Sequence, residues 1–303
     1  MTGTDRRDTA ATRWLIASVL APPRGEESSL VDALRRLGAR LIEREGERVL
    51  AHVPAPPDPA AVLRELEAAV RESTSLRDAG LGWRWRSEEE WEARWAREVR
   101  VRRVGERIVV VPSGGEPTLP ARADDLVIRL APGLAFGTAE HPTTRGCLVL
   151  LERLVAAGDR VVDVGAGSGI LSIAAALLGA RRVRALEADG MACADARRNV
   201  DLNGVARRVD VRQVEVGPRD LRRLRRYDGI VANIGAGILV PLLPSFAGAL
   251  AADGWLVLSG ILRSERSEVV TAARDGRLAL VSDRVDDGWW TGWFRRDAPR
   301  PAR

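Results

Sequence analysis

Residues 161–180, VVDVGAGSGILSIAAALLGA, join a short apolar run to three closely spaced glycines and a second apolar run. The glycines stand at positions 165, 167 and 169, and glycine permits both a tight turn and a close approach of the backbone to a ligand. The second run predicts a helix over residues 170–178. The pattern therefore indicates a buried strand, a glycine-rich loop and a helix whose first amides can meet a carboxylate or a phosphate.

The spacing of these glycines bears on the cofactor. A dinucleotide loop has the pattern GxGxxG, whereas here the sixth position is Ile170 and the pattern is GxGxG, which favours S-adenosylmethionine over NAD. Glu187 ends the next predicted strand, 22 positions after Gly165, where a carboxylate can accept hydrogen bonds from both ribose hydroxyls. Asp189 lies beyond the strand end and is the weaker candidate. The alternatives are a purely structural glycine turn and a solvated carboxylate at a strand end.

Strands and helices alternate from residue 160 onward, which calls for a parallel sheet covered on both faces. The last two strands are joined by a DDG turn and should form an antiparallel hairpin. This α/β class, a doubly wound Rossmann-like sheet ending in a hairpin, is the fold that class I methyltransferases show. The strands are expected at 160–164, 182–187, 208–214, 227–233, 255–260, 277–285 and 289–295.

The first part of the chain has a different order of elements: strand, helix, strand, strand, helix, strand. This order is the split βαβ pattern of ferredoxin-like α+β domains. We therefore expect a small domain at residues 1–95, a connector at 96–130 and the larger domain at 131–303. The six elements are expected at 13–20, 26–37, 39–42, 48–53, 60–71 and 81–86.

The net charge of +5 and the isoelectric point near 10.5 resemble those of a nucleic-acid-binding protein. The chain contains no lysine, however, so all of its 47 basic side chains are arginine. Because arginine does not lose its proton at ordinary pH, a small excess raises the isoelectric point without a concentrated basic patch. The net charge alone thus does not decide whether the protein binds an acidic or RNA-containing partner.

Cysteine and histidine usage predicts no metal site. The only such residues are Cys147, Cys193, His52 and His141, and they lack the spacing of metal ligands. Two isolated cysteines fit a reducing cytoplasm. A charge-free stretch at 229–252 is long enough to span a bilayer, but glycines and prolines interrupt it, so a buried strand end followed by a buried helix is favoured over a membrane segment.

Asn233 ends the fourth strand of the predicted sheet, at the carboxyl edge where ligands of open α/β sheets bind. Its amide can orient either the cofactor or the acceptor. Methyltransferases that act on exocyclic amines of bases or on glutamine carry an Asn-Pro-Pro-aromatic motif at this point. This chain has Asn-Ile-Gly-Ala at 233–236, which lowers the expectation of a nucleobase substrate.

The segment PGLAFGTAEHPTT, at residues 132–144, is similar to the PGLAFGTGTHPTT signature of the ribosomal protein L-eleven methyltransferase family, PrmA. The resemblance continues through the glycine loop, LNGV at 202–205 and the strands at 227–233 and 255–260, and it reaches back into the small domain. It implies a cytoplasmic enzyme that depends on S-adenosylmethionine and trimethylates amino groups of ribosomal protein L-eleven. In this reading the small domain recognises the protein substrate, and neither a membrane nor direct binding of nucleic acid is required.

The resemblance also implies a set of site residues. Asn233 is expected to be catalytic and the most sensitive residue on the acceptor side, and no single general base is expected. His141 stands in the same segment as Phe136, and the two can wall the cofactor and the acceptor. The residues expected to bind the cofactor are Thr144, Gly165, Gly167, Glu187, Asn233 and Phe136.

Three departures from the family leave the acceptor open. Ala139 and Glu140 replace Gly-Thr, and Gly235 replaces a leucine. Glu140 can attract a cationic lysine or point to solvent. The alternatives are therefore a related enzyme acting on another protein or a small metabolite, and a non-catalytic module that binds adenosylmethionine. The tryptophans at 83, 85, 91 and 95 either pack the two domains together or form a substrate-facing surface.

Overall fold

The computed structural model separates the chain into two compact units, Met1–Trp95 and Ala96–Arg303. Among the residues that it describes, no helix is both long and apolar enough to cross a membrane. The described residues are 13–21, 27–39, 41–54, 58–73, 80–87, 89–90, 93, 95, 100–115, 119–120, 122–133, 135–224 and 226–297.

The first unit has the predicted ferredoxin-like order of elements. Its four-stranded antiparallel sheet has the strand order β2-β3-β1-β4, so β4 is an edge strand. Alternate residues of β1, among them Leu15 and Ala17, pack on Leu30 and Leu34 of α1 and on Leu66 of α2. The elements are β1 (Arg13–Leu20), α1 (Glu27–Arg36), β2 (Leu41–Glu45), β3 (Arg48–Pro54), α2 (Pro59–Ser73) and β4 (Gly82–Ser87).

The second unit begins with a three-stranded sheet inside the segment predicted as a connector. β5 (Arg102–Val104) pairs antiparallel with β6 (Ile108–Pro112), which pairs parallel with β7 (Leu126–Leu130). Of these three strands only β6 matches a strand that the sequence predicts, at residues 107–112. β5 has three residues and β7 has five, and such short strands give little periodicity to read.

The large sheet has seven strands in the order β10-β9-β8-β11-β12-β14-β13. The first five run parallel, and β14 pairs antiparallel with β12 and β13, so the predicted doubly wound sheet with a terminal hairpin is confirmed. The strands are β8 (Arg160–Val164), β9 (Arg182–Glu187), β10 (Val209–Gln213), β11 (Tyr227–Asn233), β12 (Leu250–Leu262), β13 (Leu278–Asp286) and β14 (Trp289–Arg296).

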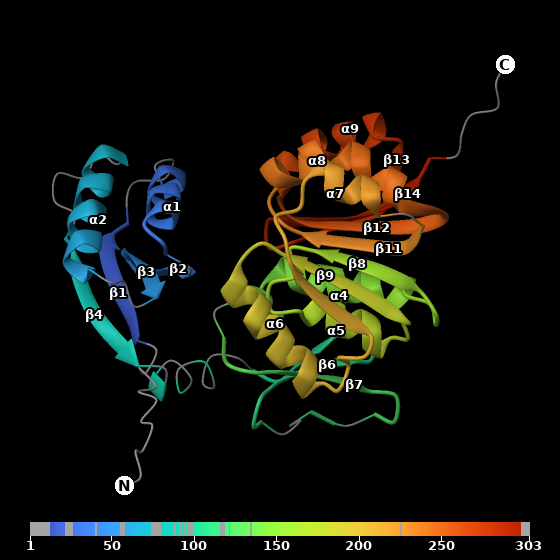
Figure 1. The fold of residues 1–303 in the computed structure, drawn as a ribbon, viewed down its shortest axis with the longest axis horizontal. Coiled ribbons are helices and arrows are strands. Elements are labelled where there is room, and N and C mark those ends of the chain that lie inside the picture. Colours follow the sequence, from blue (N-terminus) through green and yellow to red (C-terminus); the bar gives the residue numbers. More distant parts are fainter. Residues whose placement is uncertain are drawn as a thin grey trace, which may run out of the picture. The chain divides into compact units, whose positions relative to one another are not determined.

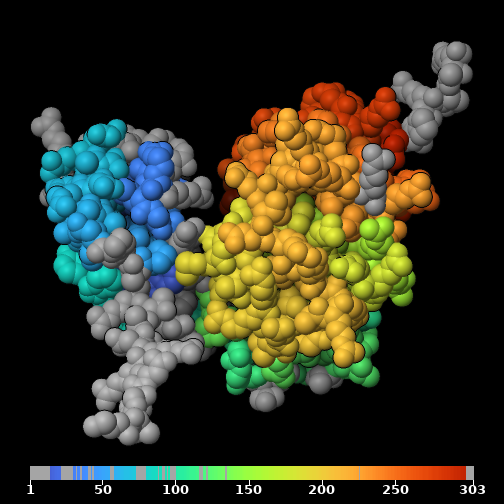
Figure 2. All heavy atoms as spheres, in the orientation of Figure 1, coloured from blue at the N-terminus to red at the C-terminus, as the bar shows by residue number. Residues whose placement is uncertain are grey.

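Helices lie on both faces of this sheet (Figure 1). Figure 2 shows α6 and the segment that follows it, in yellow and orange, on the side of the second unit that is turned to the viewer. The charge-free stretch at 229–252 is the end of β11 followed by α8, as predicted, and α8 continues through its two internal prolines. The helices are α4 (Pro142–Leu154), α5 (Ile170–Leu177), α6 (Gly190–Leu202), α7 (Pro218–Arg223), α8 (Ala236–Ala249), the short η1 (Arg263–Glu265) and α9 (Arg266–Asp275).

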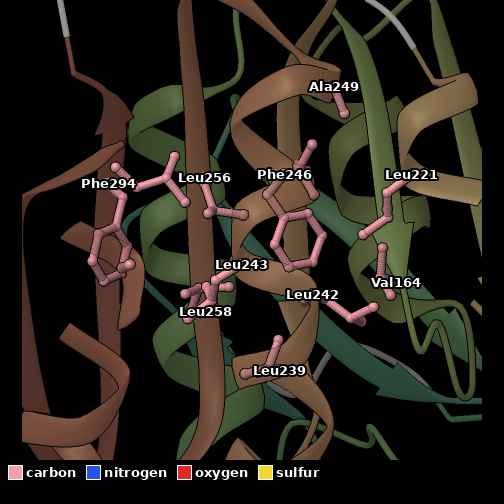
Figure 3. Packing of buried hydrophobic residues seen from close by; sticks show 14 of the residues in the cluster. Val164, Leu221, Leu239, Leu242, Leu243, Phe246, Ala249, Leu256, Leu258 and Phe294 are labelled. Carbon is pink, nitrogen blue, oxygen red and sulfur yellow. The ribbon is translucent and has the colours of Figure 1, made fainter. Parts of the chain in front are cut away.

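The main core lies between α7, α8, α9 and one face of the sheet. Phe246 of α8 is fully buried and sits among Leu221, Leu256 and Val164 (Figure 3). Burying a side chain of this kind stabilises the fold by about 1.5–3 kcal/mol. The core thus fixes β8 and β11 side by side, and the functional side chains lie at their ends.

Candidate active site

The candidate site lies where the order of the strands reverses. The chain runs outward from β8 through β9 to β10 and then returns to β11, which pairs with the other side of β8. In open α/β sheets ligands bind at such a reversal, outside the carboxyl ends of the strands. The ends of β8 and β11 carry Gly165 and Asn233, so the topology brings these two predicted residues to one edge.

The backbone of the glycine loop is held by the neighbouring strand and by the segment before α4. Gly165 donates its N–H to the carbonyl oxygen of Leu186 at 2.8 Å, and Ser168 donates to that of Phe136 at 2.9 Å. Gly167 has φ 52°, and a Cβ at this position would stand 2.5 Å from the Phe136 carbonyl oxygen. Only glycine fits here without displacing the backbone of either segment.

Glu187 is held by two backbone amides rather than left in solvent. Its Oε2 accepts from the N–H of Gly167 at 2.9 Å, and its Oε1 accepts from the N–H of Asp189 at 2.9 Å. Each oxygen has capacity to accept a further hydrogen bond. Asp189, the competing carboxylate, caps α6 through bonds from Met191 and Ala192. Glu187 is therefore the carboxylate that the fold presents beside the glycine loop.

Asp163 is a buried acid that the sequence reading did not single out. Ser172 donates to its Oδ2 at 2.7 Å, while its Oδ1 has no hydrogen-bond partner among the described residues. Burial, assisted by the charge of Glu187, raises the pKa of Asp163 to about 7. An acid interrupting the apolar run VVDV was the signal that could have identified it.

Asn233 and Thr144 meet across the site. The Asn233 amide donates to the hydroxyl oxygen of Thr144 at 3.5 Å, and Thr144 is fully buried near the start of α4. This bond directs the Nδ2 of Asn233 toward Thr144. The opposite atom, Oδ1, is buried without a hydrogen-bond partner in the described part of the chain, so it is an acceptor still available to a ligand.

Phe136 contributes its backbone to one part of the site and its ring to another. Its carbonyl oxygen accepts from the glycine loop, whereas the residue as a whole is 53% exposed and its ring lies 5.1 Å from the ring of His141, centroid to centroid. Asn199, which the sequence reading missed, ties this segment to the loop: it donates to the carbonyl oxygen of Ser168 and accepts from the N–H of Ala131.

The three departures from the family signature have separate surroundings. Glu140 forms an ion pair with Arg102 at 2.7 Å, so an arginine of the same chain already balances its charge. Ala139 is buried at φ 66°, a left-handed conformation that alanine rarely adopts. A Cβ on Gly235 would meet no atom within 4 Å. Only Glu140 is engaged by a charged partner.

The donor set suits S-adenosylmethionine better than a metal ion. Glu187 can accept from hydroxyl groups, and the carboxyl group of Asp163 and the amide oxygen of Asn233 each keep a buried acceptor atom without a partner. The described residues contain no group of three His, Cys, Asp or Glu side chains placed to hold a metal ion. The site therefore offers hydrogen-bond acceptors to an organic ligand that carries hydroxyls and positive charge.

Comparison with known proteins agrees with this geometry. The sequence profile of the family described as ribosomal protein L11 methyltransferase (PrmA) matches residues 28–297. The ribosomal protein L11 methyltransferase of Symbiobacterium thermophilum is 42% identical over 71% of this chain and 70% of its own length. That of Pelotomaculum thermopropionicum is 40% identical over 82% and 79%.

Solved structures agree as well. The crystal structure of ribosomal protein L11 methylase from Lactobacillus delbrueckii subsp. bulgaricus aligns with a TM-score of 0.60 and 32% identity, covering 65% of this chain and 99% of that one. A profile that spans most of the sequence and relatives above 30% identity over more than two thirds of it point to the same assignment. The chain belongs to the ribosomal protein L11 methyltransferase family.

Proposed function

We propose that this chain transfers methyl groups from S-adenosylmethionine to lysine side chains and other amino groups of ribosomal protein L11. The observation that carries the proposal is the unpartnered, buried Oδ1 of Asn233, fixed by Thr144 beside the glycine loop. An amide oxygen at that position accepts a hydrogen bond from an amine. Membership of a protein methyltransferase family is the reason for taking the bound amine as the methyl acceptor and S-adenosylmethionine as the methyl donor.

Thr144, Gly165, Gly167, Glu187 and Asn233 would hold the cofactor, together with the backbone of Phe136. Glu187 would accept from the ribose hydroxyls, since both of its oxygens are already aimed by backbone amides. When bound, S-adenosylmethionine supplies a methyl group activated by a positively charged sulfonium.

Asn233 would orient the acceptor. Its Oδ1 accepts one N–H of the neutral amine and so turns the nitrogen lone pair toward the methyl group. His141 and Glu140, the titratable side chains of the 132–144 segment, are engaged by Thr143 and Arg102. We therefore assign no general base: burial beside a sulfonium lowers the pKa of the ammonium, and its proton leaves to water. Positioning and exclusion of water would then supply most of the rate.

The first unit, residues 1–95, would recognise the protein substrate. Its edge strand β4 presents Trp83, 55% exposed, and Trp85, 38% exposed, on either side of the exposed Arg84. Exposed aromatic side chains of this size are enriched at protein interfaces. Trp95 is buried and Trp91 lies outside the described residues. A ribosomal substrate would place the reaction in the cytoplasm, and the proposal requires neither a membrane nor direct contact with nucleic acid.

The test is a methyl-transfer assay with tritiated S-adenosylmethionine and purified ribosomal protein L11, run beside whole lysate and small amines. We expect label in lysine residues of that protein. Label that appears only in another protein or in a small amine would contradict the proposed acceptor. Bound cofactor with no labelled acceptor would favour the non-catalytic alternative.

Variants at the site make the assay specific. Asn233→Ala removes the acceptor-orienting oxygen and should lower kcat by about 100-fold while the affinity for S-adenosylhomocysteine changes much less. Thr144→Ser keeps the hydroxyl that fixes the amide and should stay near the wild type, whereas Thr144→Val should lose about tenfold in kcat. Equal activity of the two Thr144 variants would show that this hydroxyl does not position the Asn233 amide.

A further inference from the structure

Three aromatic rings from distant parts of the sequence stand in a row beside the site. The ring centroids of Phe136 and His141 are 5.1 Å apart with an interplanar angle of 64°, and those of His141 and Trp289 are 4.6 Å apart at 68°. Each ring is thus turned edge to face against the next. Phe136 is largely exposed, and His141 and Trp289 are only half-buried. We refer to these three residues as the aromatic row.

The centre and one end of the row are tied to the surroundings of Asn233. His141 bonds to Thr143, the neighbour of the residue that holds the Asn233 amide. Trp289 pairs with Leu262 of β12, and Asn233 itself pairs with Ser259 of the same strand. The Ser259 hydroxyl closes the link by donating to the carbonyl oxygen of Thr143 at 3.4 Å. The row therefore lies at the acceptor edge of the sheet, beyond the carboxyl end of β11.

The charges around the row favour a cation. Burial and the charge of Arg145 lower the pKa of His141, so its ring is neutral near pH 7. The charge of Arg145 is itself paired with Asp286 at 3.1 Å. The exposed carboxylate of Asp287 also acts on the His141 ring. Neutral aromatic rings next to a carboxylate form a surface that attracts a positive, weakly hydrated group.

We propose that the aromatic row binds the methylated ammonium head of the acceptor side chain, and that it binds more tightly as methyl groups are added. The proposal rests on the proposed function, because it concerns the amine that this site would methylate. A mono- or dimethylated lysine carries its proton at neutral pH, and its methyl groups spread the positive charge over an apolar surface. Aromatic faces attract such a head through cation–π contact. The row would thus retain a partly methylated side chain between successive transfers.

The first test measures binding without catalysis. The full-length protein is titrated with three probes by ligand-observed NMR: N-acetyl-trimethyllysine amide, N-acetyl-lysine amide and the neutral isostere in which a carbon replaces the charged nitrogen. We expect trimethyllysine to bind about tenfold more tightly than either of the others. Equal binding of trimethyllysine and its neutral isostere would overturn the cation–π assignment.

Variants assign the effect to the row. Trp289→Leu and Phe136→Leu should each remove most of the preference for trimethyllysine, and Trp289→Phe should restore part of it. Val285→Ala, at an exposed position of the same hairpin, is the matched control and should keep the preference. An unchanged preference in both leucine variants would place the bound probe elsewhere and contradict the proposal.

The second test reads the distribution of products by mass spectrometry in single-encounter reactions with ribosomal protein L11. Compared with the wild type, Trp289→Leu should release a larger share of its product as mono- and dimethylated lysine and a smaller share as trimethyllysine. If transfer occurs but the probes show no preference, the row proposal is wrong and the proposed function stands. If the preference is present and no transfer occurs, the proposed function is wrong and the binding site stands.

Discussion

The two halves of the candidate site are built in different ways. On the cofactor side, backbone atoms form most of the contacts: the amides of Gly165, Gly167 and Ser168 donate to acceptors on neighbouring segments. On the acceptor side, the contacts are between side chains, such as the Glu140–Arg102 pair and the rings of the aromatic row. Few substitutions are compatible with the backbone geometry of the cofactor side. On the acceptor side, substitutions of side chains can alter which acceptor binds while cofactor binding is preserved.

The largest effect should come from the buried acid on the cofactor side. The pKa of Asp163 is about 7 in the folded protein and 3.8 ordinarily, so the unfolded chain loses this proton first as pH rises. Folding should become less favourable between about pH 4 and pH 7, by up to about 4 kcal/mol in total. Asp163→Asn should remove this loss and be more stable than the wild type at pH 8.

Urea unfolding of the protein without cofactor at pH 5 and pH 8 checks this expectation. Asp253→Asn, at an exposed position, serves as the control and should follow the wild type at both pH values. A difference between Asp163→Asn and the wild type that is the same at pH 5 and pH 8 would show that the buried carboxyl does not titrate in this range.

A pair of glycine substitutions tests the contrast directly. Gly167→Ala places a Cβ 2.5 Å from a backbone oxygen at a positive φ, so it should cost about 2 kcal/mol of stability and weaken S-adenosylhomocysteine binding by at least about 30-fold. Gly235→Ala has φ −60° and open space, so both quantities should stay within about 0.5 kcal/mol of the wild type. Calorimetry and thermal unfolding measure both. Similar losses in the two variants would remove the distinction between the halves.

A third substitution isolates backbone conformation on the acceptor side. Asp287 and Gly288 both have positive φ and form the two-residue turn between Asp286 and Trp289. A Cβ on Gly288 would meet no atom within 4 Å, so Gly288→Ala carries only the conformational cost, about 1 kcal/mol. Thermal unfolding should show this loss with unchanged affinity for S-adenosylhomocysteine. A fall in cofactor affinity would mean that the hairpin supports both halves.

The smallest effect should follow loss of the Glu140–Arg102 pair. Both side chains are about one-third exposed, so Glu140→Gln should cost less than about 1 kcal/mol, and the difference should shrink in 1 M NaCl. Chemical unfolding at low and high salt measures it. A cost that survives high salt would indicate that the hydrogen bond from Arg102 to Glu140 matters more than the attraction between their charges.

Most of the fold could be predicted from the sequence because periodicity marks long, regular elements. β8, β9 and β11 have the predicted limits, and both the hairpin and the ferredoxin-like order are present. β12 begins five residues earlier than expected, at Leu250, because Gly254 and two alanines weaken the apolar signal at its start. β5 and β7 were missed because they gain stability from pairing with β6, which sequence periodicity does not report.

The site was predictable only where function requires a backbone geometry. The glycine loop and the strand-end residues Glu187 and Asn233 follow from positions along the chain, and the structure brings them to one edge. Trp289 could not be paired with His141 in advance, because the two are 148 positions apart in the sequence and meet only through the fold. The assigned binding roles of Thr144, Gly165, Gly167, Glu187, Asn233 and Phe136 remain predictions for the variants above to test.

One ring serves the acceptor edge and a helix at the same time. The Nδ1 of His141 accepts from the N–H of Thr143 at 3.3 Å and thereby caps α4. A bulky acceptor that pushed this imidazole aside would break the cap and so weaken the first turn of the helix. Low pH would therefore weaken both the helix start and the ring contacts at the acceptor edge. A proton on Nδ1 turns the cap from an acceptor into a donor and places positive charge at the helix start, where the dipole repels it.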